Sequence, residues 1–337
     1  MNASTHVVTI GASAGGVEAL SALVRDLPAN LDAAVFVVLH IPAHTPSSLP
    51  SILQRCTSLA VSAAVDNEPI VRGRIVVAPA DRHLILEPNR VRVTRGPKEN
   101  RHRPSIDALF RSASVAFGPR AIGVVLSGML DDGTAGLWAI KNGGGRALVQ
   151  EPASAQYASM PESALRHVAV DSVQPAEQLA GEISRLIAER LPGVVEPAPE
   201  HLAVENLIAL EGNGLKAGVM SLGKVSAYTC PDCHGVLVQI EEGKVVRFRC
   251  HTGHAFSFKS LLAEVNEAID KGLWDTLRAI EERILLLRQM AESAAATSGP
   301  EVAAQCDVEA AAAEVRVKLL HEMVLDSKLF GHGPEKI

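Results

Sequence analysis

The feature that most constrains the fold lies near the start of the chain, where an apolar run meets a glycine-rich turn. Residues 7–10 (VVTI) are apolar or β-branched, which predicts a short buried strand. The strand ends at residues 11–16 (GASAGG), and a helical apolar pattern follows over residues 17–27. Such a turn lies at the edge of a sheet, and its backbone amides face whatever binds there. Ser13 stands at its apex, in a G-x-S-x-G arrangement typical of a nucleophile elbow.

The same turn also resembles a dinucleotide-binding loop in which serine replaces the middle glycine. That interpretation requires an acidic residue at the end of the next strand, about 20 positions further on, to bind the ribose. The next apolar run, residues 34–39, ends instead in His40. A serine after the first strand and a histidine after the second favour acyl transfer over nucleotide binding.

Short apolar runs alternate with helical patterns from residue 5 to about residue 191. This alternation predicts an α/β fold with a doubly wound, mostly parallel sheet. Further strands are expected at 60–65, 74–78, 83–86, 90–94, 121–126, 146–150 and 168–171, and helices at 15–26, 47–56, 104–117, 132–142, 159–167 and 175–190. The two strands around residues 87–90 are expected to form an antiparallel hairpin.

Three kinds of chemically active side chain follow strands of this predicted sheet, namely Ser13, His40 and the pair Asp131 and Asp132. The carboxyl ends of parallel strands line the working crevice, where a serine, a histidine and a carboxylate can act as nucleophile, base and orienting group. Each residue also has an ordinary explanation, because turn serines and Asp-Asp-Gly segments cap helices and a strand-end histidine is often structural. Their joint occurrence at one sheet edge favours the catalytic interpretation.

Length and charge limit the remaining possibilities. A chain of 337 residues can form two domains with a sizeable core, and a net charge of −6 argues against binding to nucleic-acid phosphates. No apolar run approaches 18 residues and no basic segment precedes the first strand, so we expect neither a transmembrane helix nor a signal peptide. The five cysteines are then expected in a reducing cytoplasm, where paired cysteines indicate metal ligands before disulfides.

A second group of chemically active residues follows a Pro-, Gly- and Glu-rich segment, residues 193–227, which we interpret as a linker. A C-x2-C pair and a C-x3-H pair flank an alternating hairpin, a spacing that predicts a zinc-ribbon-like module over residues 228–256. The expected ligands of one structural zinc are Cys230, Cys233, Cys250 and His254, with His251 as the alternative fourth ligand.

Two long helical patterns, at about residues 258–295 and 301–328, are separated by a break at residues 298–300. They predict an antiparallel helical hairpin in the last part of the chain, residues 257–330. Packing of the two helices on each other is the simplest interpretation, and dimerisation or binding of a partner helix remains open.

Five motifs together carry a resemblance to a known family. They are GASAGG (11–16), VLHIP (38–42), GPKENRHRPSID (96–107), SGMLDDG (127–133) and QEPASA (150–155). In this order they resemble the catalytic domain of chemotaxis protein-glutamate methylesterases of the CheB type, over a domain that we place at residues 1–192. The resemblance implies hydrolysis of glutamate 5-methyl esters on chemoreceptors with release of methanol, no catalytic cofactor, and in some members deamidation of receptor glutamines.

The resemblance also implies the site residues: Ser13 as nucleophile, His40 as base, Asp132 as orienting carboxylate and Met129 as donor of an amide to the oxyanion. Asp131 is then only a neighbour of the site. Leu130 and Ser159 depart from the family pattern, because glycine is common at both positions. Family members typically carry an N-terminal receiver domain, and none is expected here because the first catalytic strand begins at residue 6.

Two hypotheses about function follow. The first is a cytoplasmic ester hydrolase that acts on methylated chemoreceptor segments, with a sensor kinase or a receptor methyltransferase as a further partner, and with no nucleic-acid binding or membrane insertion. The basic stretch 98–103 would then guide acidic receptor segments. The alternative is a non-catalytic regulatory or scaffold protein that binds a receptor or sensor kinase through the zinc module and the hairpin. On the first hypothesis, residues 1–192 alone are expected to fold and to hydrolyse ester.

Overall fold

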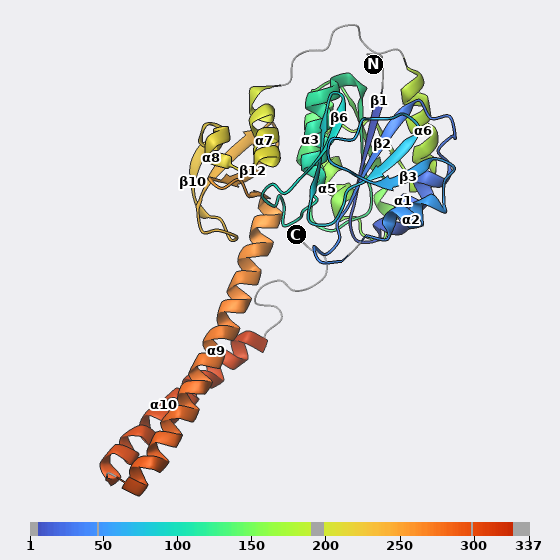
Figure 1. Ribbon diagram of the computed structural model, residues 1–337. Helices are drawn as coiled ribbons and strands as arrows, with labels where there is room; N and C mark the ends of the chain where they lie inside the picture. The colour runs from blue at the N-terminus through green and yellow to red at the C-terminus, as the bar shows by residue number, and fades with distance from the viewer. Residues whose placement is uncertain (1–5, 46, 190–198, 298, 326–337) are drawn as a thin grey trace. The chain divides into compact units, whose positions relative to one another are not determined.

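The computed structural model describes residues 6–45, 47–189, 199–297 and 299–325, and Figure 1 shows their helices and strands. The chain divides into two compact units, Met1–Leu261 and Leu262–Ile337. The first unit contains a seven-stranded parallel sheet, a small four-stranded antiparallel sheet (the small sheet), a two-stranded hairpin and several helices.

The large sheet has seven strands, all parallel, in the order β3-β4-β2-β1-β7-β8-β9. Their bounds are β1 (His6–Ala12), β2 (Ala33–Leu39), β3 (Ala60–Ala63), β4 (Arg74–Val77), β7 (Ala121–Val125), β8 (Arg146–Gln150) and β9 (Ser172–Gln174). The chain order reverses at β1, which pairs with β2 on one side and with β7 on the other. Ligands of open α/β sheets bind at such a switch point. The doubly wound parallel sheet expected from the sequence is therefore confirmed.

Helices cover both faces of this sheet (Figure 1). One face packs against α1 (Gly16–Arg25), α2 (Leu49–Gln54) and α6 (Ala176–Ala188). The other packs against α3 (Ile106–Phe117), α4 (Thr134–Asn142), α5 (Ser159–His167) and the hairpin of β5 (His83–Glu87) and β6 (Arg90–Thr94). Alternate residues of β2 enter the two cores, Val35 and Val37 on one side and Phe36 and Val38 on the other. Burial on both faces explains the unbroken apolar runs of the central strands.

Two segments differ from the sequence-based expectation. The strand expected at residues 168–171 is β9, at Ser172–Gln174, because the backbone amide of Val168 still donates to Ala164 O at the end of α5. The segment expected as a linker, residues 193–227, contains α7 (Glu200–Glu211) and α8 (Gly214–Ala217). Its polar composition conceals α7, which buries the charged side chain of Glu205. Short 3-10 helices lie at Gly118–Arg120, Pro152–Ser154 and Val219–Ser221.

The small sheet is antiparallel and has the strand order β10-β11-β12-β13. Its strands are β10 (Lys224–Thr229), β11 (Val236–Glu242), β12 (Val245–Cys250) and β13 (Ala255–Ser257). It begins inside the segment expected as a linker. Its buried core contains two of the cysteines together with Leu237, Phe248, Phe256 and Leu261. The turns that carry the cysteines connect β10 to β11 and β12 to β13.

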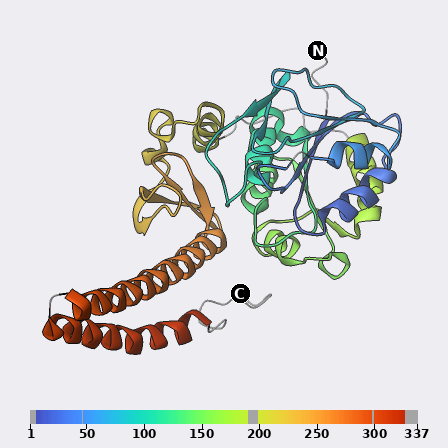
Figure 2. The same ribbon diagram turned by 60° about the horizontal axis from the view of Figure 1, so that its bottom comes forward.

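Two long helices, α9 (Phe258–Thr297) and α10 (Pro300–Leu325), complete the described chain (Figure 2). Arg288 pairs with Glu314 at 2.7 Å, and Glu281, earlier in α9, lies 4.0 Å from His321, later in α10, so the two helices run antiparallel. The expected helical hairpin is confirmed, and its expected last residues, 326–330, lie outside the described residues. No helix among the described residues has both the length and the apolar character that crossing a bilayer requires.

Candidate active site

Ser13 follows β1 directly, at the switch point of the sheet. Its backbone amide donates to Ser127 O at 2.9 Å, and its carbonyl oxygen accepts from Gly16 N at 2.9 Å. Gly15 has a φ of 69°, and a Cβ at that position would lie 2.8 Å from Ser127 Oγ. The turn therefore requires glycine there, both for its left-handed backbone and for the close packing of the loop after β7.

His40 and Asp132 are in direct contact. His40 Nε2 lies 2.8 Å from Asp132 Oδ2, and the two side chains are only 5% and 2% exposed. Because an ionised carboxylate can only accept, Nε2 carries the proton and Nδ1 keeps its lone pair. Nδ1 is buried and has no hydrogen-bond partner within the described part of the chain. Ser13 and His40 line the same cleft, so the free nitrogen of the imidazole is available as a base.

Asp132 is surrounded by hydrogen-bond donors. Besides His40, they are Ile106 N (2.7 Å), Ser105 Oγ (3.0 Å), Asn100 Nδ2 (3.0 Å) and Asp107 N (3.3 Å). Two of these are backbone amides at the N-terminus of α3, where the helix dipole favours negative charge. Burial alone would raise the pKa of Asp132, but the hydrogen bond and charge of His40, aided by Asn100, hold it well below its ordinary value. Asp132 therefore carries its negative charge beside the His40 imidazole.

A second buried carboxyl group, that of Asp107, lies beside Asp132. Burial, and then the negative charge of Asp132, raises the pKa of Asp107 well above its ordinary value. Asp107 Oδ1 accepts from Gly133 N at 3.1 Å and from Gly136 N at 2.6 Å, which fixes the turn before α4. The environment thus lowers the pKa of Asp132 and raises that of Asp107, which makes Asp132 the stronger acid of the two.

Asp131 points away from the imidazole and towards the small sheet. Its Oδ1 accepts from Ser257 Oγ at 2.7 Å, and burial raises its pKa. Of the two adjacent aspartates, the structure brings Asp132 to His40, as the family resemblance implied.

His102 lies on the face of the His40 ring. The two ring centroids are 3.6 Å apart and the ring planes differ by 12°. Burial, and then the charge of His40, lowers the pKa of His102 to about 3, so its ring is neutral at physiological pH. In the sequence, His102 belongs to the basic stretch 98–103. In the structure it is an uncharged ring stacked on the His40 imidazole.

The loop after β7 carries Met129 and Leu130. Across the described residues, the backbone amides of Met129 and Ala14 donate to no protein acceptor. Leu130 has a φ of 60°, in the left-handed region that glycine adopts most easily, which explains why glycine is common there. The Leu130 carbonyl accepts from Ser159 Oγ at 2.9 Å. The two residues that depart from the family pattern are therefore hydrogen-bonded partners.

The cleft in front of Ser13 has a volume of about 530 Å³. Its lining residues are Ser13, Ala14, His40, Ile41, Pro42, Ala43, Asp81, Lys98, Arg101, His102 and Arg103. Arg103 is held by Asp81 at 2.6 Å, while Lys98 is exposed at the rim. The cleft is lined by three basic side chains and one carboxylate, so the charge at its mouth favours an acidic ligand.

The four expected metal ligands form a cluster whose ligand atoms all lie within 4.8 Å of one another: Cys230, Cys233, Cys250 and His254. Neighbouring atoms are separated by 3.6 Å (Cys233 Sγ to Cys250 Sγ), 3.6 Å (Cys250 Sγ to His254 Nδ1) and 3.7 Å (Cys230 Sγ to His254 Nδ1). Tetrahedral zinc, with bonds of about 2.0–2.3 Å, holds adjacent ligand atoms about 3.5–3.8 Å apart. The cluster fits zinc, and His251 is not part of it, because its ring packs against the backbone of Gly235.

Fold and site together define a class of protein: a doubly wound α/β domain with a serine after one strand and a His–Asp pair beside it. Residues 8–183 match the family model described as CheB methylesterase, and the chain belongs to this family. A crystal structure of the Thermotoga maritima CheB methylesterase catalytic domain is similar, with 30% sequence identity and a TM-score of 0.53. That match covers 54% of this chain and 99% of the other.

Curated relatives agree with this assignment. The chain is 38% identical over 181 residues to the protein-glutamate methylesterase/protein-glutamine glutaminase 2 of Rhizobium johnstonii, which covers 52% of this chain and 49% of the relative. It is 37% identical over 182 residues to a putative protein-glutamate methylesterase/protein-glutamine glutaminase of Leptospira interrogans, over 54% and 94% of the two chains. The chain spans about half the length of the first of these relatives. The match to the family model ends before α7, so it does not include the small sheet or the helical hairpin.

Four residues at or next to the His40–Asp132 pair were not predicted from the sequence to have a role: Asn100, Ser105, Asp107 and Ser257. Three of them lie in the motif at residues 96–107, which was noted as a family motif without a role for these side chains. Ser257 lies outside every motif, and its contacts with Asp131 and Asn100 are made only in the folded chain.

Proposed function

We propose that this protein hydrolyses glutamate 5-methyl esters on chemoreceptors and releases methanol, with Ser13 as nucleophile, His40 as base and Asp132 as the carboxylate that orients the base. The observation that carries the proposal is the contact between His40 Nε2 and ionised Asp132, which leaves Nδ1 unprotonated in the cleft that also contains Ser13. The relatives whose names include protein-glutamate methylesterase support this substrate class.

In the first step, His40 Nδ1 takes the proton from Ser13 Oγ while Oγ attacks the ester carbonyl. The imidazolium that forms keeps its Nε2–H directed at Asp132, whose negative charge stabilises it. His102 is neutral and adds no opposing charge beside that imidazolium. The imidazolium then returns its proton to the methoxy oxygen, and methanol leaves from the tetrahedral intermediate.

The negative charge that develops on the carbonyl oxygen requires donors. We assign this role to the backbone amides of Met129 and Ala14, because neither donates to an acceptor among the described residues. In the second half of the reaction, water attacks the glutamyl–serine ester, with His40 again as the base, and the free glutamate side chain is released. The same steps on an amide would deamidate a receptor glutamine and release ammonia.

The glutamate methyl ester that fits this cleft best lies in a receptor segment whose neighbouring residues are acidic. Lys98, Arg101 and Arg103 line the cleft and favour negative charge near the scissile ester. A cytoplasmic location and contact with methylated receptor segments follow from this proposal. The alternative of a non-catalytic scaffold is less well supported, because it gives no reason for the alignment of His40 with Asp132.

We also propose that the cluster of Cys230, Cys233, Cys250 and His254 holds a structural zinc ion. All four ligands come from the protein and leave no position for a reacting group, so the metal would stabilise the small sheet. Metal binding and folding of this sheet are then coupled, because the unfolded segment has no preformed site.

Substitution of the nucleophile tests the proposed reaction. Ser13→Ala should lower methanol release from methylated receptor fragments by about three orders of magnitude or more, as loss of a triad member does in other serine hydrolases. Ser21→Ala is the matched control, since Ser21 Oγ donates only to Val17 O within α1. Near wild-type turnover by a folded Ser13→Ala protein contradicts the mechanism.

A further inference from the structure

The loop that carries Asn100 and His102 is paired with the small sheet. Asn100 N donates to Ala255 O at 2.8 Å, and Ala255 N donates to Lys98 O at 3.1 Å. These bonds form a parallel bridge between Glu99 and Ala255, so the loop pairs with β13 at the edge of the small sheet. An element outside the matched methylesterase region therefore holds a loop that lines the active-site cleft.

The side chain of Asn100 connects the small sheet to the catalytic carboxylate. Its Oδ1 accepts from Ser257 N at 2.8 Å and from Ser260 Oγ at 3.0 Å. Its Nδ2 donates to Asp107 Oδ2 at 2.8 Å and to Asp132 Oδ1 at 3.0 Å. The orientation of the amide is determined, because the Ser257 amide can only donate and ionised Asp132 can only accept.

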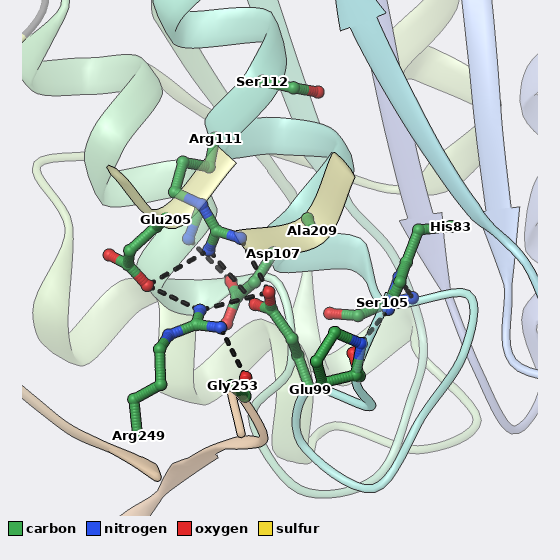
Figure 3. Close-up of polar contacts among 12 residues, drawn as sticks. His83, Glu99, Ser105, Asp107, Arg111, Ser112, Glu205, Ala209, Arg249 and Gly253 are labelled. Atoms are coloured by element: carbon green, nitrogen blue, oxygen red, sulfur yellow. Dashed lines mark hydrogen bonds and ion pairs between the residues drawn. The ribbon is translucent and has the colours of Figure 1, made fainter. Parts of the chain in front are cut away.

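A buried cluster of ion pairs holds the same loop to the same sheet. Glu99 lies 2.8 Å from Arg111 of α3 and 3.1 Å from Arg249 of β12 (Figure 3). Arg249 also binds Glu205 of α7 at 2.6 Å and donates to Gly253 O at 2.8 Å. All four charged side chains are at most 3% exposed, so the loss of one would leave a buried charge without its partner.

The cluster is directly linked to the proposed zinc site. Arg249 precedes the ligand Cys250, and Gly253 precedes the ligand His254. The hydrogen bond from Arg249 to Gly253 O thus closes the turn that carries both ligands. β13, which begins at Ala255, follows that turn without an intervening residue. A change in the conformation of this turn therefore displaces β13, and with it the hydrogen bonds that β13 makes to Asn100.

We propose that the small sheet with its Cys3His site is a positioning element of the active site, and that Asn100 is the positioning residue through which it aligns Asp132 with His40. The inference rests on the proposed function, which it extends from the catalytic residues to the segment that holds them in place. Methylester hydrolysis by this chain then depends on the metal-bound, folded state of the small sheet.

The experiment uses Ser260→Ala in the full chain, because this change removes the hydrogen bond from Ser260 Oγ to Asn100 Oδ1 and leaves the proposed catalytic residues in place. It also removes one acceptor of Ser257 N, which still donates to Asn100 Oδ1. We expect kcat to fall roughly tenfold with KM unchanged, the effect of losing about one buried hydrogen bond at the reacting geometry. Ser226→Ala is the matched control, since Ser226 Oγ donates to Leu237 O within the same sheet. It should leave kcat and KM unchanged.

A spectroscopic measurement separates positioning from a general loss of structure. The His40 Nε2 proton, shared with Asp132, gives a low-field proton resonance that reports the His40–Asp132 contact directly. We expect Ser260→Ala and Asn100→Ala to shift or broaden this resonance, and Ser226→Ala to leave it unchanged. We also expect the double variant Ser260→Ala/Asn100→Ala to match Asn100→Ala alone, because both changes act on one path.

Removal of metal from the full-length protein with a chelator, followed by metal analysis, tests the link to the Cys3His site. We expect the His40 resonance to shift and kcat to fall, and addition of zinc to restore both. An unchanged resonance and kcat in Ser260→Ala, or in the metal-free protein, would overturn the proposal. A wild-type protein that hydrolyses no ester would refute the proposed function alone, because the resonance still reports whether the small sheet positions Asp132.

Discussion

Replacement of the two adjacent aspartates by asparagine gives the sharpest test of the active-site geometry. Asp132 Oδ2 accepts from His40 Nε2 and Ile106 N, and Oδ1 accepts from three further donors. An amide group offers one acceptor atom in place of two. In either orientation of Asp132→Asn, at least two buried donors therefore face an NH2 group.

The two orientations damage the site in different ways. If the NH2 group faces His40, the imidazole must present the Nε2 lone pair and carry its proton on Nδ1, where it can no longer accept one from Ser13. If the NH2 group faces Asn100, then Asn100 Nδ2, Ser105 Oγ and Asp107 N lose their acceptor, and no negative charge stabilises the imidazolium. In both cases we expect kcat to fall by about 10⁴, the effect of the corresponding change in serine proteases. Loss of two buried acceptor contacts should also lower the free energy of unfolding by about 2–6 kcal/mol.

Asp131→Asn is the matched control, because Asp131 Oδ1 accepts only from Ser257 Oγ among the contacts described, and an amide oxygen can accept the same bond. We expect its kcat to stay within about threefold of wild type, since a bond of the same kind remains. The assay is methanol release from methylated receptor fragments, with urea unfolding to show that each variant is folded. The reverse ranking of the two variants, or a folded Asp132→Asn protein with more than about a tenth of wild-type kcat, would refute this reasoning.

Three further predictions concern stability and metal content. Leu130→Gly should raise the free energy of unfolding by about 1 kcal/mol in a urea titration, because φ is 60° at this position and glycine adopts it without strain. A decrease would show that the contacts of the Leu130 side chain stabilise the fold by more than the backbone strain destabilises it. Glu205→Gln should lower the free energy of unfolding at pH 7 by about 3–5 kcal/mol, because it leaves buried arginines underpaired. Buried arginines hold the pKa of Glu205 well below its ordinary value of 4.5 against the opposing effect of burial, so the wild type loses this stability as the pH falls below that value. The difference between wild type and Glu205→Gln should therefore shrink at acid pH, and a constant difference would contradict the assignment. Cys230→Ser should lose one bound zinc per chain by metal analysis, whereas Cys306→Ser, in α10, should retain it; equal zinc content in the two variants would exclude the proposed site.

Much of the fold could be predicted because its signals are local. The apolar run at residues 34–39 and the turn at residues 11–16 each specify a structure over a few neighbouring residues. Regular alternation of strand and helix then indicates a parallel sheet, whose carboxyl edge gathers Ser13, His40 and Asp132. The metal cluster could also be predicted from a local signal, because a tight turn brings the closely spaced Cys230 and Cys233 together.

What the sequence did not reveal depends on contacts between distant segments. The role of Asn100 requires Ser257 and Ser260, which are 157 and 160 residues away. Helix α7 was missed because Glu205 interrupts its apolar face, and the arginines that neutralise this carboxylate lie 42 and 44 residues further on. No pattern within one segment indicates that a charged side chain will be buried. The free-energy cost of removing the charge from water is offset only by partners that folding brings near.

The backbone of the loop gives a further reason to expect that the catalytic region depends on the small sheet. Asn100 and Arg101 both have positive φ values, 49° and 75°, and neither is glycine. Each such residue costs about 1–2 kcal/mol and persists only where its surroundings hold it. For Asn100, the hydrogen bonds that hold it come largely from β13 and from the start of α9.

A fragment of residues 1–192 retains the large sheet but lacks all of these contacts, and it also removes Glu205 and Arg249 from the buried Glu99–Arg111 pair. The Thermotoga maritima catalytic domain is matched over 99% of its length by 54% of this chain, so that domain folds without a counterpart of the rest of this chain. In this chain, however, the loop should relax towards negative φ, which moves Asn100 from Asp132 and His102 from His40. We therefore expect the fragment to fold but to lose the low-field His40 resonance and at least tenfold in kcat, in contrast to the activity expected from the sequence alone. A folded fragment with wild-type kcat and an unchanged resonance would show that the loop keeps its conformation unaided.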